Sequence, residues 1–221
     1  MKIKAIITGS TGMVGKAVLL ECLENEKVGI VLIINRHPVG VQHPKLIEII
    51  LENFEELPSV KDDLKGYNAC YHCLGISALG MNEKNYYKIT YNITKELADI
   101  LYEHNSNLIF NYVSGVGTDS SEKGKIMWAR VKGKTENMIL NKGFKDAYSF
   151  RPGFIVPEKG VKSRTKLYNL LYLLFKPSFP VLKKSSSITT TTKIGKAMIN
   201  VSLFPMNKKI LTNKDINALA K

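Results

Sequence analysis

Three glycines spaced three residues apart constrain the fold of this chain more than any other feature. Gly9, Gly12 and Gly15 lie between a short β-branched run at residues 2–8 and a stretch with helical spacing at residues 12–25. In such a loop the first glycine permits a sharp turn, the second lets the backbone approach a pyrophosphate, and the third lets the helix pack closely on the strand. We therefore predict a dinucleotide-binding loop rather than a glycine-rich turn without a ligand. The residues expected to contact the dinucleotide here are Gly9, Thr11, Gly12, Met13, Val14 and Gly15.

Strand-like and helical patterns alternate along the first 150 residues. Short apolar runs typical of strands lie at residues 2–8, 28–35, 45–51, 68–74, 107–114 and 147–151. Helical spacing covers residues 12–25, 83–103 and 125–140. This alternation is typical of βαβ units, and it predicts an α/β fold with a doubly wound parallel sheet of the Rossmann type. The 221 residues are expected to form a single domain.

The pattern changes after Pro152. Residues 152–192 contain an apolar helical pattern near residues 166–175 and a Ser/Thr run at residues 185–192, which is expected to lead into a helix at residues 193–203. We predict that residues 152–192 form a small C-terminal cap. The apolar helix would cover the substrate cleft or pair with a second copy in a homodimer. An alternative is that it lies in a membrane interface.

No apolar run approaches the ~20 residues that a membrane span needs. The N-terminal residues reach glycine too soon for a secretory signal. Three cysteines without a framework of spacings fit a reducing compartment. We therefore expect a cytoplasmic protein without a membrane span.

Positive charge is concentrated in the second half of the chain. The whole chain carries +13, and residues 122–221 hold 21 Lys/Arg against 5 Asp/Glu, a net charge of +16. Such asymmetry is compatible with an anionic partner such as nucleic acid or a phosphorylated ligand. The sequence contains no basic-aromatic motif of a known nucleic-acid module. A phosphorylated cofactor and scattered solvated lysines are simpler explanations.

The end of the second predicted strand bears on the choice of cofactor. An acidic residue about 20 residues beyond the glycine loop would bind the adenosine ribose of NAD. Here the chain has Asn35, Arg36 and His37, and no acid before Glu48. Arg36 could hold a 2′-phosphate in bidentate fashion, which favours NADP over NAD. The alternative is an exposed loop arginine.

Cys70 and Cys73 form a C-x-x-C within a predicted buried strand. Neighbouring residues of a strand point to opposite faces, so this pair is expected to be core rather than redox-active. No second ligand pair has zinc-site spacing, so no metal site is predicted.

Five segments together suggest a family. The glycine loop, YHCLGIS (71–77), NYVSGVG (111–117), WARVKGKTE (128–136) and SFRPGFIVP (149–157) follow the order of an atypical short-chain dehydrogenase/reductase. The chain resembles the Tat-interacting-protein-like branch of the NAD(P)-binding epimerase/dehydratase group over nearly its whole length. The resemblance implies an NAD(P)-dependent oxidoreductase, or an epimerase-like enzyme, that acts on a small carbonyl substrate.

The resemblance also implies contacts with the cofactor. Asn53 stands where the family often has an Asp near the adenine. Lys132 matches the lysine that holds the nicotinamide ribose. The adenosine and its ribose would be lined by Leu74, Gly75 and Ile76, and the nicotinamide would be flanked by Pro152, Gly153 and Phe154.

The catalytic positions agree only in part with the family. Ser114 matches the serine that orients a substrate carbonyl, and Lys132 would act beside it, but Trp128 stands where the family has its acid/base tyrosine. Indole has no titratable oxygen, so Trp128 cannot perform that proton transfer.

Another tyrosine or a water held by Ser114 could supply the proton, or the reaction could need no such acid. In a third alternative the protein is a non-catalytic NADP-binding regulator that acts through protein contacts. Direct nucleic-acid binding through the basic half is a further alternative.

Overall fold

The computed structural model describes residues 2–162, 179 and 185–221. The apolar helix expected near residues 166–175 lies outside them. Within the described residues, no helix combines the length and the apolar character that crossing a bilayer requires.

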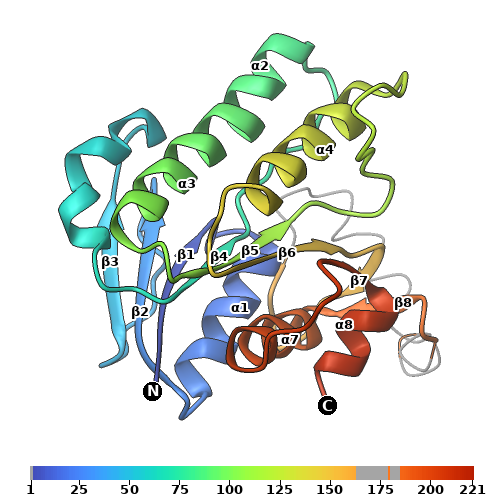
Figure 1. Cartoon of the computed structure of the whole chain (residues 1–221). Coiled ribbons are helices and arrows are strands. Elements are labelled where there is room, and N and C mark those ends of the chain that lie inside the picture. The colour runs from blue at the N-terminus through green and yellow to red at the C-terminus, as the bar shows by residue number, and fades with distance from the viewer. Residues whose placement is uncertain (1, 163–178, 180–184) are drawn as a thin grey trace.

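A seven-stranded parallel sheet forms the centre of the protein (Figure 1). Its strands lie in the order β3-β2-β1-β4-β5-β6-β9, as the doubly wound prediction requires. The strands are β1 (Ile3–Thr8), β2 (Val28–Asn35), β3 (Leu46–Ile50), β4 (Ala69–His72), β5 (Ile109–Val113), β6 (Asp146–Arg151) and β9 (Ile210–Thr212). The six strands predicted before residue 152 are therefore all present.

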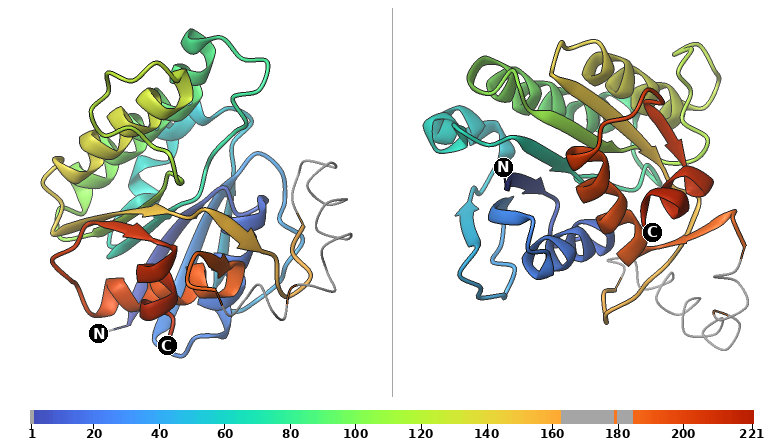
Figure 2. Two further views of the ribbon diagram at one scale, coloured as in Figure 1. Left: turned by 90° about the vertical axis from the view of Figure 1, so that its right-hand side faces the viewer. Right: turned by 60° about the horizontal axis from the view of Figure 1, so that its bottom comes forward.

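Helices cover both faces of the sheet (Figure 2). One face packs against α1 (Met13–Glu24) and α7 (Thr191–Leu203), with α8 (Asn213–Leu219) beside α7. The other face packs against the 3₁₀ turns η1 (Phe54–Leu64), α3 (Ile93–His104) and α4 (Met127–Leu140). Side chains of β1 alternate between these layers: Ile7 joins the α1 side and Ile6 the α3 side. The central strands are thus buried on both faces, which explains their continuous apolar runs.

Local signals set the ends of several helices. Thr190 caps α7 by accepting a hydrogen bond from the Lys193 amide at 3.1 Å, as the Ser/Thr run predicted. The long helix expected at residues 83–103 is continuous but contains a π-helical turn, η2 (Lys88–Asn92), between α2 (Glu83–Tyr87) and α3. Periodicity alone could not reveal this one-residue expansion.

The ends of the predicted cap segment pair with each other. β7 (Phe154–Val156) and β8 (Ile188–Thr190) form a separate two-stranded parallel sheet. This pairing anchors the chain on both sides of the undescribed residues. A distinct cap over the cleft stays a prediction.

A buried chain of hydrogen bonds joins β1, β4 and α3 below the carboxyl edge of the sheet. The Thr94 hydroxyl donates to the Thr90 carbonyl at 2.6 Å, so its oxygen accepts from Nε2 of His72 at 2.9 Å. Nδ1 of His72 then accepts from the Thr8 hydroxyl at 2.7 Å. The imidazole is neutral because burial lowers the pKa of His72 to about 3.

This buried imidazole makes stability dependent on pH. The pKa of His72 is about 3 in the fold, against an ordinary value of 6.5, so the unfolded chain binds more protons between these values. We expect the free energy of unfolding to fall by about 2 kcal/mol between about pH 7.5 and about pH 5. Urea titrations at both pH values measure the change. The His72→Gln variant should lose this pH dependence of the free energy of unfolding. The variant His37→Gln, at an exposed position, should keep it. An equal dependence in His72→Gln would contradict the assignment.

Candidate cofactor and substrate site

A hollow at the carboxyl edge lies where the strand order reverses, between β1 and β4. In doubly wound sheets this switch point is the crevice in which ligands bind. Six of the predicted cofactor residues line the hollow together, with Asn35, His37, Phe54 and Cys73. Those six are Gly9, Thr11, Gly12, Arg36, Leu74 and Gly75.

Two glycines of the loop are required by close backbone approach. Gly9 has φ +73°, and a Cβ on it would lie 2.7 Å from backbone atoms of Cys73 and Leu74. A Cβ on Gly15 would lie 2.2 Å from the carbonyl oxygen of Gly9. The loop therefore turns sharply against β4 while α1 packs directly on the turn, as the glycine spacing predicted.

Gly12 leaves the start of α1 accessible to an anion. It occupies the N-cap position and offers no side chain to cap the helix, and the first turn contains no acidic residue. A Cβ on Gly12 would meet only the Gly9 carbonyl, at 3.3 Å. The amides of Met13 and Val14 have no acceptor within the helix. Together with the helix dipole they form an anion-binding end, so the loop fits a pyrophosphate.

A second hollow continues from the first toward the adenosine end. It is lined by Asn53, Leu74, Gly75 and Ile76, and also by Lys88 and the side of α3. Arg36 lines both hollows. The Asn53 side chain also caps η1 by accepting from the Glu55 amide at 3.1 Å.

The loop that carries Arg36 is fixed by two charged side chains. Glu48 of β3 accepts hydrogen bonds from the Asn35 side chain at 3.1 Å and from the Val39 amide at 2.9 Å. Lys16 donates to the Val39 carbonyl at 3.0 Å. In the sequence, Glu48 lies too far beyond the glycine loop to be expected as the acid that binds the ribose. β3 nevertheless brings it beside the end of β2. Its carboxylate is engaged with this loop.

A second group of the predicted site residues lies at the turn after β5. Lys132 of α4 donates from Nζ to the carbonyl oxygen of Ser114. Burial lowers the pKa of the Lys132 ammonium to about 8, and the Glu136 carboxylate opposes that shift. Gly115 and Gly117 both have positive φ, which lets the turn pass close to α4. Pro152 joins the turn by accepting from the Val116 amide at 3.0 Å.

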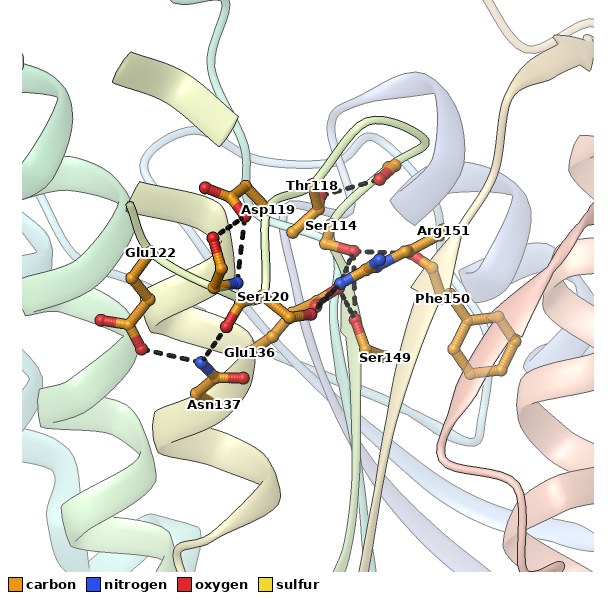
Figure 3. A network of polar contacts seen from close by, with 12 residues as sticks. Ser114, Thr118, Asp119, Ser120, Glu122, Glu136, Asn137, Ser149, Phe150 and Arg151 are labelled. Atoms are coloured by element: carbon orange, nitrogen blue, oxygen red, sulfur yellow. Dashed lines mark hydrogen bonds and ion pairs between the residues drawn. The ribbon is translucent and has the colours of Figure 1, made fainter. Parts of the chain in front are cut away.

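The Ser114 hydroxyl is occupied inside the protein (Figure 3). Ser114 is 3% exposed, and its hydroxyl donates to Oε1 of Glu136 at 2.5 Å. The Ser149 hydroxyl donates to the same oxygen. The group of Ser114 that contacts Lys132 is thus its carbonyl. The expected contact between its hydroxyl and a substrate stays a prediction, and Glu136 competes for that hydroxyl.

Glu136 is the buried centre of this network, and the sequence did not single it out. Its side chain is fully buried and pairs with Arg151, whose Nε lies 2.9 Å from Oε1 and whose Nη2 bonds Oε2. Arg151 also donates to the Ser120 hydroxyl at 2.5 Å. The only sequence signal was the four-residue spacing from Lys132, which places both residues on one face of α4.

Trp128 lies one turn before Lys132 on α4. A Cβ on Gly117 would lie 3.1 Å from Cη2 of the indole, so the ring edge packs on the turn after β5. No tyrosine hydroxyl in the described part of the chain forms a hydrogen bond with Lys132 or with residues 114–117. That another tyrosine supplies the proton stays a prediction.

Three apolar side chains of the neighbouring segments are exposed. Val116 is 66% exposed, Ile126 58% and Phe154 44%. Val116 and Phe154 flank Gly153, whose amide donates to Asn213 at 3.1 Å.

The comparisons with known proteins identify the family. The sequence profile of the NAD-dependent epimerase/dehydratase family matches residues 5–132, more than half of the chain. The chain belongs to the NAD-dependent epimerase/dehydratase family. The mitochondrial protein FMP52 of Debaryomyces hansenii is 29% identical over 157 residues, which cover 70% of this chain and 68% of FMP52.

Solved structures show the same fold. The ADP-L-glycero-D-manno-heptose-6-epimerase of Helicobacter pylori matches with a TM-score of 0.71 and 14% identity, over 100% of this chain and 82% of the epimerase. A short-chain dehydrogenase/reductase of Saccharomyces cerevisiae matches with a TM-score of 0.67 and 13% identity, over 100% and 98%. The Bordetella bronchiseptica enzyme WbmH, solved with NAD⁺, matches with a TM-score of 0.68 and 14% identity, over 96% and 75%. The Rossmann fold and the family resemblance predicted from the sequence are confirmed.

The cysteine prediction agrees with the structure. Cys70 packs among the residues on the α3 side of the sheet and Cys73 against those on the α1 side. Burial raises the pKa of the Cys73 thiol to about 12. The described residues contain no cluster of side chains able to hold a metal ion.

Removing one partner of the buried ion pair should be costly. We expect Arg151→Met to lower the free energy of unfolding by about 3 kcal/mol, because Glu136 would remain buried without its cation. Chemical denaturation measures this loss. The control Arg130→Met, which removes a more exposed pair with Glu83, should cost at most about 1 kcal/mol. The double variant Glu136→Gln/Arg151→Met should recover part of the lost free energy of unfolding. If Arg151→Met and Arg130→Met lower the free energy of unfolding equally, the role of Glu136 is refuted.

Proposed function

We propose that this protein binds NADP(H) and uses it to interconvert a small carbonyl compound and its alcohol. The position of Arg36 carries the choice of NADP. It lines both hollows of the crevice, and it forms no ion pair with another described residue. A guanidinium there can bind a 2′-phosphate through two hydrogen bonds. Glu48, the nearest acid of β3, is engaged by Asn35 and Val39.

The remaining contacts of the cofactor follow from the geometry of the crevice. The pyrophosphate would lie on Gly12, Met13 and Val14, where the amides at the start of α1 are accessible. The adenosine would lie near Asn53 and Ile76, in the second hollow. The further residues assigned to this cofactor are Gly9, Thr11, Gly15, Leu74 and Gly75.

The nicotinamide would lie at the turn after β5, between Pro152, Gly153 and Lys132. Lys132 has three N–H groups and gives one to the Ser114 carbonyl, so others can reach the hydroxyls of the nicotinamide ribose. The cofactor supplies hydride chemistry when bound. In this assignment Ser114 acts by holding Lys132 through its carbonyl.

The exposed apolar side chains suggest the kind of substrate. Val116, Ile126 and Phe154 are exposed, and Val116 lies beside Gly153, which is assigned to the nicotinamide. A substrate with an aliphatic or aromatic body would remove their surfaces from water, at about 25 cal/mol per Å² buried.

A non-catalytic NADP-binding regulator is the second candidate, and Trp128 favours it. The indole stands at the family's acid position and cannot exchange a proton with a substrate. Nucleic-acid binding, a homodimer and a cytoplasmic location stay predictions.

Titration with reduced cofactors tests the assignment of NADP. We expect NADPH to bind at least about tenfold more tightly than NADH, since a charged hydrogen-bonded contact contributes about 1.5–3 kcal/mol. Arg36→Ala should weaken NADPH binding by about 10- to 100-fold and leave NADH binding unchanged. Cofactor fluorescence measures both affinities. His37→Ala serves as the matched control in the same loop, and equal affinities of the wild type for the two cofactors would refute the NADP assignment.

A panel of aldehydes and ketones then separates the two candidates. Oxidation of NADPH in the presence of an apolar carbonyl compound supports the enzyme. Tight NADPH binding without turnover on any member of the panel supports the regulator.

A further inference from the structure

The family's acid is missing at Trp128, but a protonated side chain lies at the same turn. Trp128 and Lys132 lie one helical turn apart on α4, so both face residues 114–117. The indole edge packs on Gly117, whereas Nζ of Lys132 binds the Ser114 carbonyl and lies 4.0 Å from the Cβ position of Gly115. No carboxylate or tyrosine of the described residues forms a hydrogen bond with Nζ of Lys132.

We propose that Lys132 is itself the proton donor of the reaction, in place of the missing tyrosine. This rests on the proposed NADP-dependent reduction. Lys132 donates a proton from Nζ to the carbonyl oxygen, so that an N–H bond breaks and an O–H bond forms. In the same step the carbonyl carbon accepts hydride from the reduced nicotinamide. The neutral amine then takes a proton from solvent, so one carbonyl, one reduced cofactor and one proton give one alcohol and one oxidised cofactor.

The surroundings of Lys132 suit this role. Burial lowers the pKa of its ammonium to about 8, so the side chain is protonated at neutral pH and can still release a proton readily. Glu136, four residues further along α4, opposes the shift. Arg151 of β6 pairs with that carboxylate, and Ser114, which follows β5, contributes only its carbonyl and its hydroxyl. Glu136 therefore stays bound to Arg151 and does not accept the proton.

Replacement by arginine separates proton donation from cofactor binding. The guanidinium of Lys132→Arg keeps the positive charge but does not deprotonate near neutral pH. We expect NADPH affinity within about threefold of the wild type and turnover lower by about 100-fold or more, the usual contribution of a general acid. The control is Lys134→Ala, at an exposed position on the same helix. It should keep both the NADPH affinity and the turnover of the wild type. Turnover of Lys132→Arg close to that of the wild type overturns the proposal.

Rescue by added amines gives a second measurement. In Lys132→Ala, ethylamine should restore turnover in proportion to its concentration, and amines of similar size should differ in rate according to their pKa values. A lysine that only holds the ribose or the fold would give no such dependence, and its absence overturns the proposal.

Cofactor binding distinguishes the failure of this proposal from the failure of the proposed function. If the wild type does not bind NADPH, the proposed function itself fails. If it binds NADPH but reduces no carbonyl compound, the proposed reaction fails and the regulator is favoured. If the wild type reduces a carbonyl compound and Lys132→Arg keeps its turnover, only the role of Lys132 as the proton donor fails and the proposed function stands.

Discussion

The fold depends on a backbone contact that excludes every side chain. Gly9 turns so tightly against Cys73 and Leu74 that no Cβ fits between them, and Gly15 brings α1 within the same small space. This contact fixes the start of α1 directly above the gap between β1 and β4. The helix dipole, the accessible amides and the switch point of the sheet thereby coincide. The residues proposed to hold the adenosine line the two hollows beside this position.

A second, independent centre lies at the turn after β5. There the buried Glu136 of α4 binds Ser114, which follows β5, together with Ser149 and Arg151 of β6. Each charge would be costly to bury alone, so the four groups must form together. The turn after β5 therefore has a rigid base, and Lys132 is held on it by a single carbonyl.

Sequence reasoning predicted the parts of the structure that local signals determine. The apolar runs located β1, β2, β4 and β5, and the glycine spacing located the loop. It missed the π-turn of η2, because one inserted residue barely changes the periodicity. It also missed the pair of Glu136 with Arg151, and the contact of Glu48 with the Arg36 loop. Both depend on the packing of distant segments, and a buried glutamate on a helix resembles a solvated one in sequence.

Helix α4 also limits how the site can change. Trp128, Lys132 and Glu136 stand on successive turns of one face, so they can only move as a unit. A rotation that brought a different residue over residues 114–117 would pull the carboxylate away from its guanidinium. New chemistry at this site must therefore come from exchanging side chains at fixed positions, or from groups supplied by other segments, while the helix itself keeps its orientation.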